Sequence, residues 1–168
     1  TICGSWPLCR ENSPLVMCSA RGDSASKALS TPLALAKYVK PYTIVKKAGM
    51  RIGIIGLMPD ITILVSKDVS DRIPAFENSE VVNKWAEYLK TEKKCDLVIA
   101  LTHIGFENEP YLDQMLVRRT RNVDLVVGGH SHTYLKAPHY EPNLDGVPVP
   151  IVQDGEWGLN VGNLKISR

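Results

Sequence analysis

The chain has 168 residues, of which 44% are hydrophobic and 23% are charged, and its formal net charge is +2. This composition is typical of one globular domain with a sizeable core, and not of a disordered chain. The small net charge gives no reason to expect nucleic acid or an anionic membrane surface as a partner. No apolar run approaches the ~20 residues that a bilayer-spanning helix needs, so no membrane span is predicted.

The N-terminal region contains three of the four cysteines, Cys3, Cys9 and Cys18. They lack the C-x-x-C spacing of a zinc knuckle, and a disulfide among them stays open because the sequence does not choose a pairing. Residues 14–19 form a short apolar run that predicts a strand. Because the chain starts with threonine and has no apolar leader, we expect it to be a processed product or an excised piece.

Two apolar segments, 42–47 and 50–57, flank Ala48-Gly49 and predict a tight β-hairpin. The first alternates apolar and polar residues, which favours a place near a sheet edge. The second does not alternate, which is typical of a strand buried on both faces. Further along, Asn78 or Ser79 is expected to cap a helix whose buried stripe carries packing. Its members are Val81, Val82, Trp85, Ala86 and Leu89.

The central part of the chain, 95–133, reads as strand, helix, strand and a glycine-histidine segment. The apolar run 96–102 predicts a buried strand that ends directly before His103. Asn108 is expected to cap the helix that follows, with Pro110 in its first turn. A second apolar run, 123–127, leads into Gly128-Gly129-His130-Ser131-His132.

A strand, a crossover helix and a second strand place the two strands parallel, so their C-terminal ends open on one edge of the sheet. If the strands are neighbours, ~4.8 Å apart, His103 can lie beside His130 and His132. A single histidine after a strand is more often structural than a ligand. Three at one edge predict a metal site, because neutral imidazole is the commonest metal ligand in proteins.

The C-terminal part is predicted to contain a loop, 134–145, with an exposed His139, and two strands at 147–153 and 160–167. Pro148 and Pro150 favour an edge position for the first of these strands. The turn around Ser131 is a poor match to a serine-hydrolase nucleophile elbow, because that motif needs glycine where Thr133 stands. Cys95 is expected to be a small buried residue.

Three blocks of sequence, 101–105, 123–133 and 150–155, resemble the 5′-nucleotidases of the calcineurin-like metallophosphoesterases. The resemblance implies an α/β fold, part of a four-layer αββα sandwich with mixed sheets. Residues 1–168 would then be a single partial catalytic domain, its C-terminal half, without the N-terminal metal-binding blocks. The family's location implies a periplasmic or extracellular protein.

The resemblance also implies a divalent metal cofactor, Zn or Mn, with two ions in the complete family domain. His103 and His130 would bind one ion and His132 the other. The family's Asp-x-His, Gly-Asp and Gly-Asn-His blocks, which supply the bridging aspartate and the catalytic histidine, are not in this sequence. We therefore expect at most one metal here, and no catalytic or substrate-binding residue is assigned. Asp60 and Asp154 are more typical of solvated turns than of ligands.

The implied activity is hydrolysis of a nucleotide, or another phosphate monoester, to an alcohol and phosphate, with little turnover by this chain alone. Two alternatives stay open: a non-catalytic metal-binding or interaction module, and a cyclic-nucleotide or nucleotide-sugar phosphoesterase. A sheet without its N-terminal strands would expose unpaired edges, which predicts a homodimer or aggregation through those edges.

Overall fold

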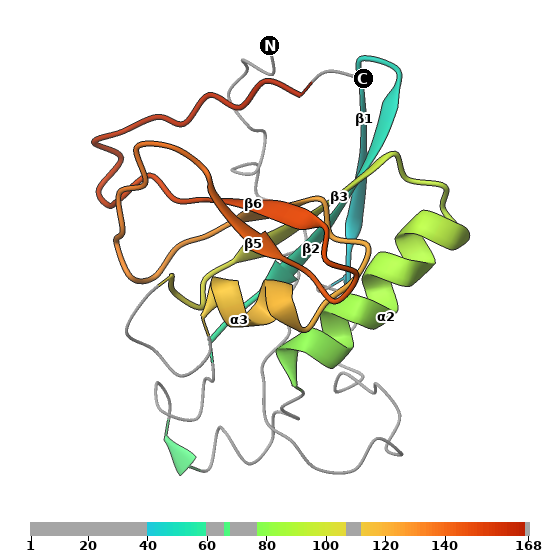
Figure 1. Ribbon diagram of the computed structural model, residues 1–168, viewed down its shortest axis with the longest axis horizontal. Helices are drawn as coiled ribbons and strands as arrows, with labels where there is room; N and C mark the ends of the chain where they lie inside the picture. The colour runs from blue at the N-terminus through green and yellow to red at the C-terminus, as the bar shows by residue number, and fades with distance from the viewer. Residues whose placement is uncertain (1–39, 60–65, 68–76, 107–111, 167–168) are drawn as a thin grey trace.

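The computed structural model of the chain describes residues 40–59, 66–67, 77–106 and 112–166 (Figure 1). The predicted strand at 14–19, the cysteines Cys3, Cys9 and Cys18, and Asp60 lie outside these residues. Within them, the chain forms one mixed β-sheet with two helices. This arrangement confirms the α/β class, while the four-layer sandwich stays a prediction.

The sheet has six strands in the order β1-β2-β3-β4-β6-β5. The four central strands, β2, β3, β4 and β6, run parallel to one another, and the outer strands β1 and β5 pair antiparallel with β2 and β6. The bounds are β1 Thr43–Lys47, β2 Met50–Leu57, β3 Leu97–Thr102, β4 Leu125–Val127, β5 His139–Pro142 and β6 Pro148–Val152, with helices α2 Asn78–Thr91 and α3 Asp113–Arg118.

The predicted hairpin is confirmed by β1 and β2. Ala48 and Gly49 both have left-handed backbone conformations, with φ of 50° and 77°, as a two-residue turn between twisted strands requires. Among the described strands β1 lies at the edge of the sheet and pairs with β2 alone, and most of its residues are exposed. β2 lies between β1 and β3 and is largely buried.

Helix α2 packs its predicted stripe against β2 and β3, with Val82, Ala86 and Leu89 fully buried and Trp85 partly buried. Its N-cap is Glu77, whose carboxylate accepts a hydrogen bond from the backbone N–H of Glu80, so the predicted cap at Asn78 or Ser79 is wrong by one or two residues. Glutamate is an unusual cap, and the sequence favoured the commoner residue types.

The larger core cluster joins residues of α2 and α3 to residues of the sheet, and Figure 1 shows the two helices beside the strands. α2 contacts β2 and β3, and α3 contacts β5 and β6. Cys95 is buried in this core, as expected. A second, smaller apolar cluster is formed by residues of β2, β3 and β4 that do not belong to the larger core. It consists of Ile52, Ile54, Ile99 and Leu125, with Leu164 packed against it.

The C-terminal part differs from its prediction in three ways. Residues 139–142 form strand β5 instead of a loop, and β5 takes the sheet edge that was predicted for the strand with Pro148 and Pro150. β6 tolerates both prolines inside the sheet because β4 pairs only with its last residues, Ile151 and Val152. The second of the two predicted strands, at 160–167, is not formed over the described residues up to 166, which are mostly exposed.

Helix α3 begins at Asp113, after Leu112 in an extended conformation, and Leu112 makes no side-chain capping bond. The described helix therefore begins later than predicted, while Asn108 and Pro110, the predicted cap and first-turn residue, lie outside the described residues. Among the described residues, no helix has the length and apolar character needed to cross a bilayer.

Candidate functional site

The candidate site lies at the C-terminal ends of β3 and β4, which are parallel neighbours as predicted. His103 follows β3 directly, and its backbone N–H donates to the Leu57 carbonyl at the end of β2, at 2.9 Å. His130 follows β4 after two glycines. The ring centroids of His103 and His130 lie 5.1 Å apart, with the rings inclined at 67°. The fold therefore brings these two predicted residues together.

His132 makes a different contact. Its Nδ1 lies 2.6 Å from Oε2 of Glu156, a residue that the sequence did not single out. Within the part of the chain that the structure describes, no three His, Cys, Asp or Glu side chains are grouped so that they could hold a metal ion. The three-histidine metal site therefore stays a prediction, with two of its rings in contact and the third paired with a carboxylate.

Burial lowers the pKa of His103, and the neighbouring His130 and then His132 lower it further, because a second positive charge nearby disfavours protonation. A lower pKa keeps the His103 ring neutral over more of the physiological pH range. Neutral imidazole is the form that binds metal ions.

Gly128 and Gly129 are glycines because there is no room for side chains at these positions. A Cβ on Gly128 would lie 2.4 Å from Oδ2 of Asp113, and a Cβ on Gly129 would lie 3.0 Å from Nδ1 of His103. The two glycines thus allow the chain after β4 to pass close to the residues that follow β3. This is the close approach for which glycine is needed.

Asp113, the first residue of α3, lies beneath this edge and is fully buried. Its Oδ1 accepts a hydrogen bond from Oγ1 of Thr102 at 2.6 Å, while its Oδ2 is buried without a hydrogen-bond partner. Burial raises the pKa of Asp113 to about 7, although the Thr102 hydrogen bond acts in the opposite direction. A neutral carboxyl group is therefore the favoured form below neutral pH.

The structure also shows the surroundings of two further residues considered in the sequence, Asp154 and His139. Asp154 is exposed, as predicted, but its backbone forms an isolated β-bridge with Tyr134 instead of the predicted turn. His139 is only partly exposed, because its ring packs at 5.2 Å from that of Phe106 and its Nε2 lies 3.2 Å from Glu141. It is thus a structural residue of β5.

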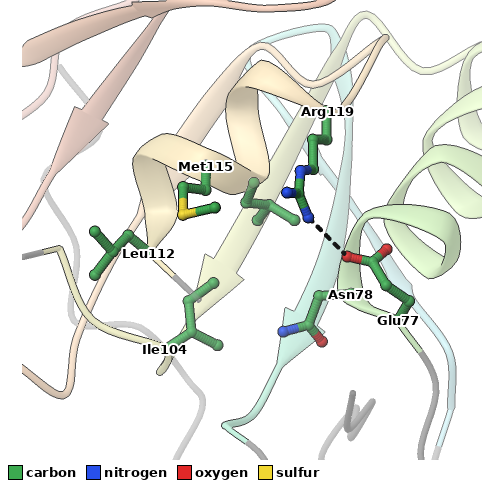
Figure 2. A pocket seen from close by; sticks show the side chains of 7 residues that line it. Glu77, Asn78, Ile104, Leu112, Met115 and Arg119 are labelled. Carbon is green, nitrogen blue, oxygen red and sulfur yellow. Dashed lines mark ion pairs between the residues drawn. The ribbon is translucent and has the colours of Figure 1, made fainter. Parts of the chain in front are cut away.

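A separate pocket lies between the start of α2 and helix α3 (Figure 2). Glu77 and Arg119 form an ion pair across it, with Oε1 and Nη1 3.9 Å apart. Apolar residues make up most of the remaining lining, and none of the predicted site histidines is among them. The lining residues are Glu77, Asn78, Ile104, Leu112, Met115, Leu116 and Arg119.

The sequence missed Glu156 and Asp113. Glu156 lies in a polar turn where a carboxylate is usually solvated, so only the fold shows its contact with His132. Asp113 falls inside a segment predicted as mid-helix. Its position at the N-terminus of a shorter helix, next to the end of β3, becomes visible only when Leu112 is known to be extended and to precede the first helical residue.

No family model matches the chain. It is 35% identical over 151 residues to a 5′-nucleotidase-related protein of Glossina morsitans morsitans, covering 79% of this chain and 25% of that protein. It is 30% identical over 147 residues to a 5′-nucleotidase of Diplobatis ommata, covering 80% and 24%. The chain thus spans about a quarter of the length of these relatives.

Among solved structures, the 5′-nucleotidase precursor of Thermus thermophilus matches with a TM-score of 0.64 and 29% identity, over 76% of this chain and 26% of that one. Sequence and structure therefore point to the same group of proteins. The chain is therefore homologous to part of the 5′-nucleotidases, over a segment that corresponds to about a quarter of its relatives' length.

Proposed function

We propose that this chain supplies His103, His130 and His132 as ligands to a divalent metal ion, Zn²⁺ or Mn²⁺, in a phosphomonoester hydrolase of the 5′-nucleotidase type. Such an enzyme converts a nucleotide to a nucleoside and phosphate. The observation that supports the proposal is the His103–His130 ring contact of 5.1 Å, at the ends of adjacent parallel strands. This edge is where open α/β sheets bind ligands.

The chemistry of the donors fits a metal ion. The lowered pKa of His103 favours the neutral ring that binds metals. Glu156 occupies Nδ1 of His132 and leaves the other ring nitrogen available, an arrangement that commonly orients metal-binding histidines. A bound metal would supply Lewis-acid activation of a water molecule and of the phosphate ester.

A complete active site requires more than these histidines. Two cations roughly 3.5–4 Å apart need a bridging carboxylate to offset their repulsion. Among the described residues, no three His, Cys, Asp or Glu side chains are grouped so that they could hold a metal ion. We therefore propose at most one metal per chain, and a role as part of a larger four-layer catalytic domain. The location outside the cytoplasm that the resemblance implies also belongs to this proposal.

Calorimetric titration of the 168-residue chain with Zn²⁺ and with Mn²⁺ tests the site. We expect about one equivalent to bind to the wild type, weaker binding to His103→Ala and His130→Ala, and unchanged binding to the control His139→Gln. Absence of binding to the wild type would refute the metal site.

Hydrolysis assays with AMP and p-nitrophenyl phosphate test the second part of the proposal. We expect the isolated chain to show little or no turnover with either metal, because the bridging carboxylate and catalytic histidine are missing. Robust hydrolysis would show that the chain is a complete enzyme. Substrate profiling of a longer reading frame would separate a nucleotidase from a cyclic-nucleotide or nucleotide-sugar phosphoesterase.

A non-catalytic metal-binding module is the second candidate, because the Asp-x-His and Gly-Asn-His blocks of the 5′-nucleotidases are not in this sequence. It predicts metal binding at one equivalent but no turnover, even when the longer reading frame is expressed. Turnover by that longer protein would exclude this candidate.

A further inference from the structure

We propose that Gln153 is a positioning residue that holds the loop Gly128–Thr133, here called the histidine loop, in the conformation that directs His130 and His132. The link to metal binding rests on the proposed function, whereas the effect on the loop does not. Gln153 follows β6, on the side of β4 away from β3. Gln153 is not one of the residues predicted to bind the metal ion.

The side-chain amide of Gln153 contacts both ends and the middle of the histidine loop. Its Nε2 donates to the Gly129 carbonyl at 3.0 Å, and the backbone N–H of Thr133 donates to its Oε1. The hydroxyl of Ser131 donates to the same Oε1 at 3.1 Å. Only a group with a donor and an acceptor in one plane can satisfy the two loop ends together, and a primary amide provides both.

The backbone of Gln153 is itself fixed. The Leu135 N–H donates to the Gln153 carbonyl at 3.0 Å, and the Gly128 N–H donates to the Val152 carbonyl at 2.8 Å. The side chain is only 2% exposed, so water cannot replace its partners easily. A buried amide on an anchored backbone therefore defines the loop, because leaving its partners unsatisfied would cost free energy.

The loop needs such a partner because its backbone is strained. His130 and His132 both have left-handed conformations, with φ of 83° and 57°, and residues other than glycine rarely adopt them. Ser131, between them, makes inward contacts instead. Its hydroxyl accepts from the Phe106 N–H at 2.9 Å and lies 2.9 Å from Oγ1 of Thr133. The Gln153 amide stabilises this loop conformation, in which the hydroxyl of Ser131 faces inward between His130 and His132.

Nuclear magnetic resonance of the full 168-residue chain tests the proposal through Gln153→Ala and Gln153→Glu. At pH 8 we expect both variants to shift the backbone amide peaks of residues 130–133 and the ring nitrogen peaks of His130 and His132. The buried hydrogen bond of Thr120 to the Val117 carbonyl lies at the opposite end of β4. Thr120→Val is therefore a matched control, and it should leave those peaks unmoved.

The Gln153→Glu variant separates positioning from simple destabilisation. Its carboxylate keeps the size of glutamine but repels the Gly129 carbonyl, whereas its protonated form donates a hydrogen bond to that carbonyl. We expect the backbone peaks of the loop to approach those of the wild type at the same pH when the pH falls to 5. Loop peaks that stay at the wild-type positions in the variants at pH 8, or that move equally in Thr120→Val, would overturn the proposal.

Zinc titration adds a functional measurement. If Gln153 positions metal ligands, Gln153→Ala should weaken zinc binding about tenfold or more, in the range typical of residues that orient ligands, while Thr120→Val should not. Unchanged zinc affinity in Gln153→Ala would overturn the link to metal binding. A wild type that binds no zinc would refute the proposed metal site, while the loop peaks would still decide the role of Gln153. If Gln153→Ala does not fold, the loop peaks of Gln153→Glu at pH 8 and pH 5 alone decide whether Gln153 positions the loop.

Discussion

Replacement of Asp113 by asparagine should change how the stability of the fold depends on pH. The carboxyl group is fully buried, and its pKa is raised from 3.8 to about 7 by burial. Because the folded pKa is higher than the unfolded one, stability is greatest below 3.8 and is lost as the pH rises to about 7. The shift corresponds to about 4 kcal/mol of destabilisation at pH 8 relative to a permanently neutral group.

Asp113→Asn removes the ionisation but keeps the size of the side chain and an acceptor for Thr102. Its amide nitrogen would replace an oxygen that has no hydrogen-bond partner, a burial that costs roughly 1–3 kcal/mol at every pH. The informative quantity is therefore the change with pH of the difference in unfolding free energy between variant and wild type. We expect this difference to rise in favour of the variant by ~1.4 kcal/mol per pH unit between pH 5 and 7.

Urea denaturation of both proteins from pH 5 to pH 8 measures this difference. The effect of the lowered His103 pKa on stability has the opposite sign, but it is present in both proteins and cancels to first order. Asp145→Asn, at a half-exposed carboxylate, is the control and should show no such slope. Parallel stability profiles for wild type and Asp113→Asn would refute the inference that this buried carboxyl group is held neutral.

Three further outcomes are expected. Gly128→Ala should lower the free energy of unfolding by about 1–3 kcal/mol in thermal or urea denaturation, because its Cβ would meet Oδ2 of Asp113 at 2.4 Å; an equal loss in an Asp113→Ala background would contradict this cause. Glu156→Gln should weaken zinc binding about tenfold by releasing Nδ1 of His132, and unchanged affinity in calorimetry would show that Glu156 does not orient a ligand. Within the described residues the strands at the sheet edges are β1 and β5, whose Lys46, Lys47 and Pro142 oppose strand addition. We therefore expect the predicted homodimer only at high concentration, and light scattering that shows a monomer at every concentration would contradict pairing through these edges.

The parts of the fold that the sequence predicted are those whose signals are local. The two residues Ala48-Gly49 specify the hairpin, and apolar runs specify the buried parallel strands β2 and β3. These patterns were enough to place His103 and His130 at one edge of the sheet. His103 and His130 come into contact because β3 and β4 are neighbours and because Gly128-Gly129 lets the chain turn closely after β4.

The missed elements depend on contacts that their own residue patterns do not reveal. β5 has the polar sequence His-Tyr-Glu-Pro and becomes a strand only by pairing with β6, while Arg118 neutralises its buried Glu141 at 2.7 Å. Residues 160–166 have a strand-like pattern, but β4 and β5 already occupy both sides of β6. Side-chain contacts such as His132–Glu156 could not be predicted, because they depend on how two turns lie together.

The parallel pairing at the centre of the sheet also has a consequence for folding kinetics. Each central pair joins segments separated by long stretches of chain, as in Ile52 with Leu97 and Val126 with Ile151. Such non-local contacts form slowly, because the entropy of closing a large loop is lost before the contact stabilises anything. The β1–β2 hairpin can form early, whereas the edge that carries His103 and His130 is assembled only when the strands on either side are in place.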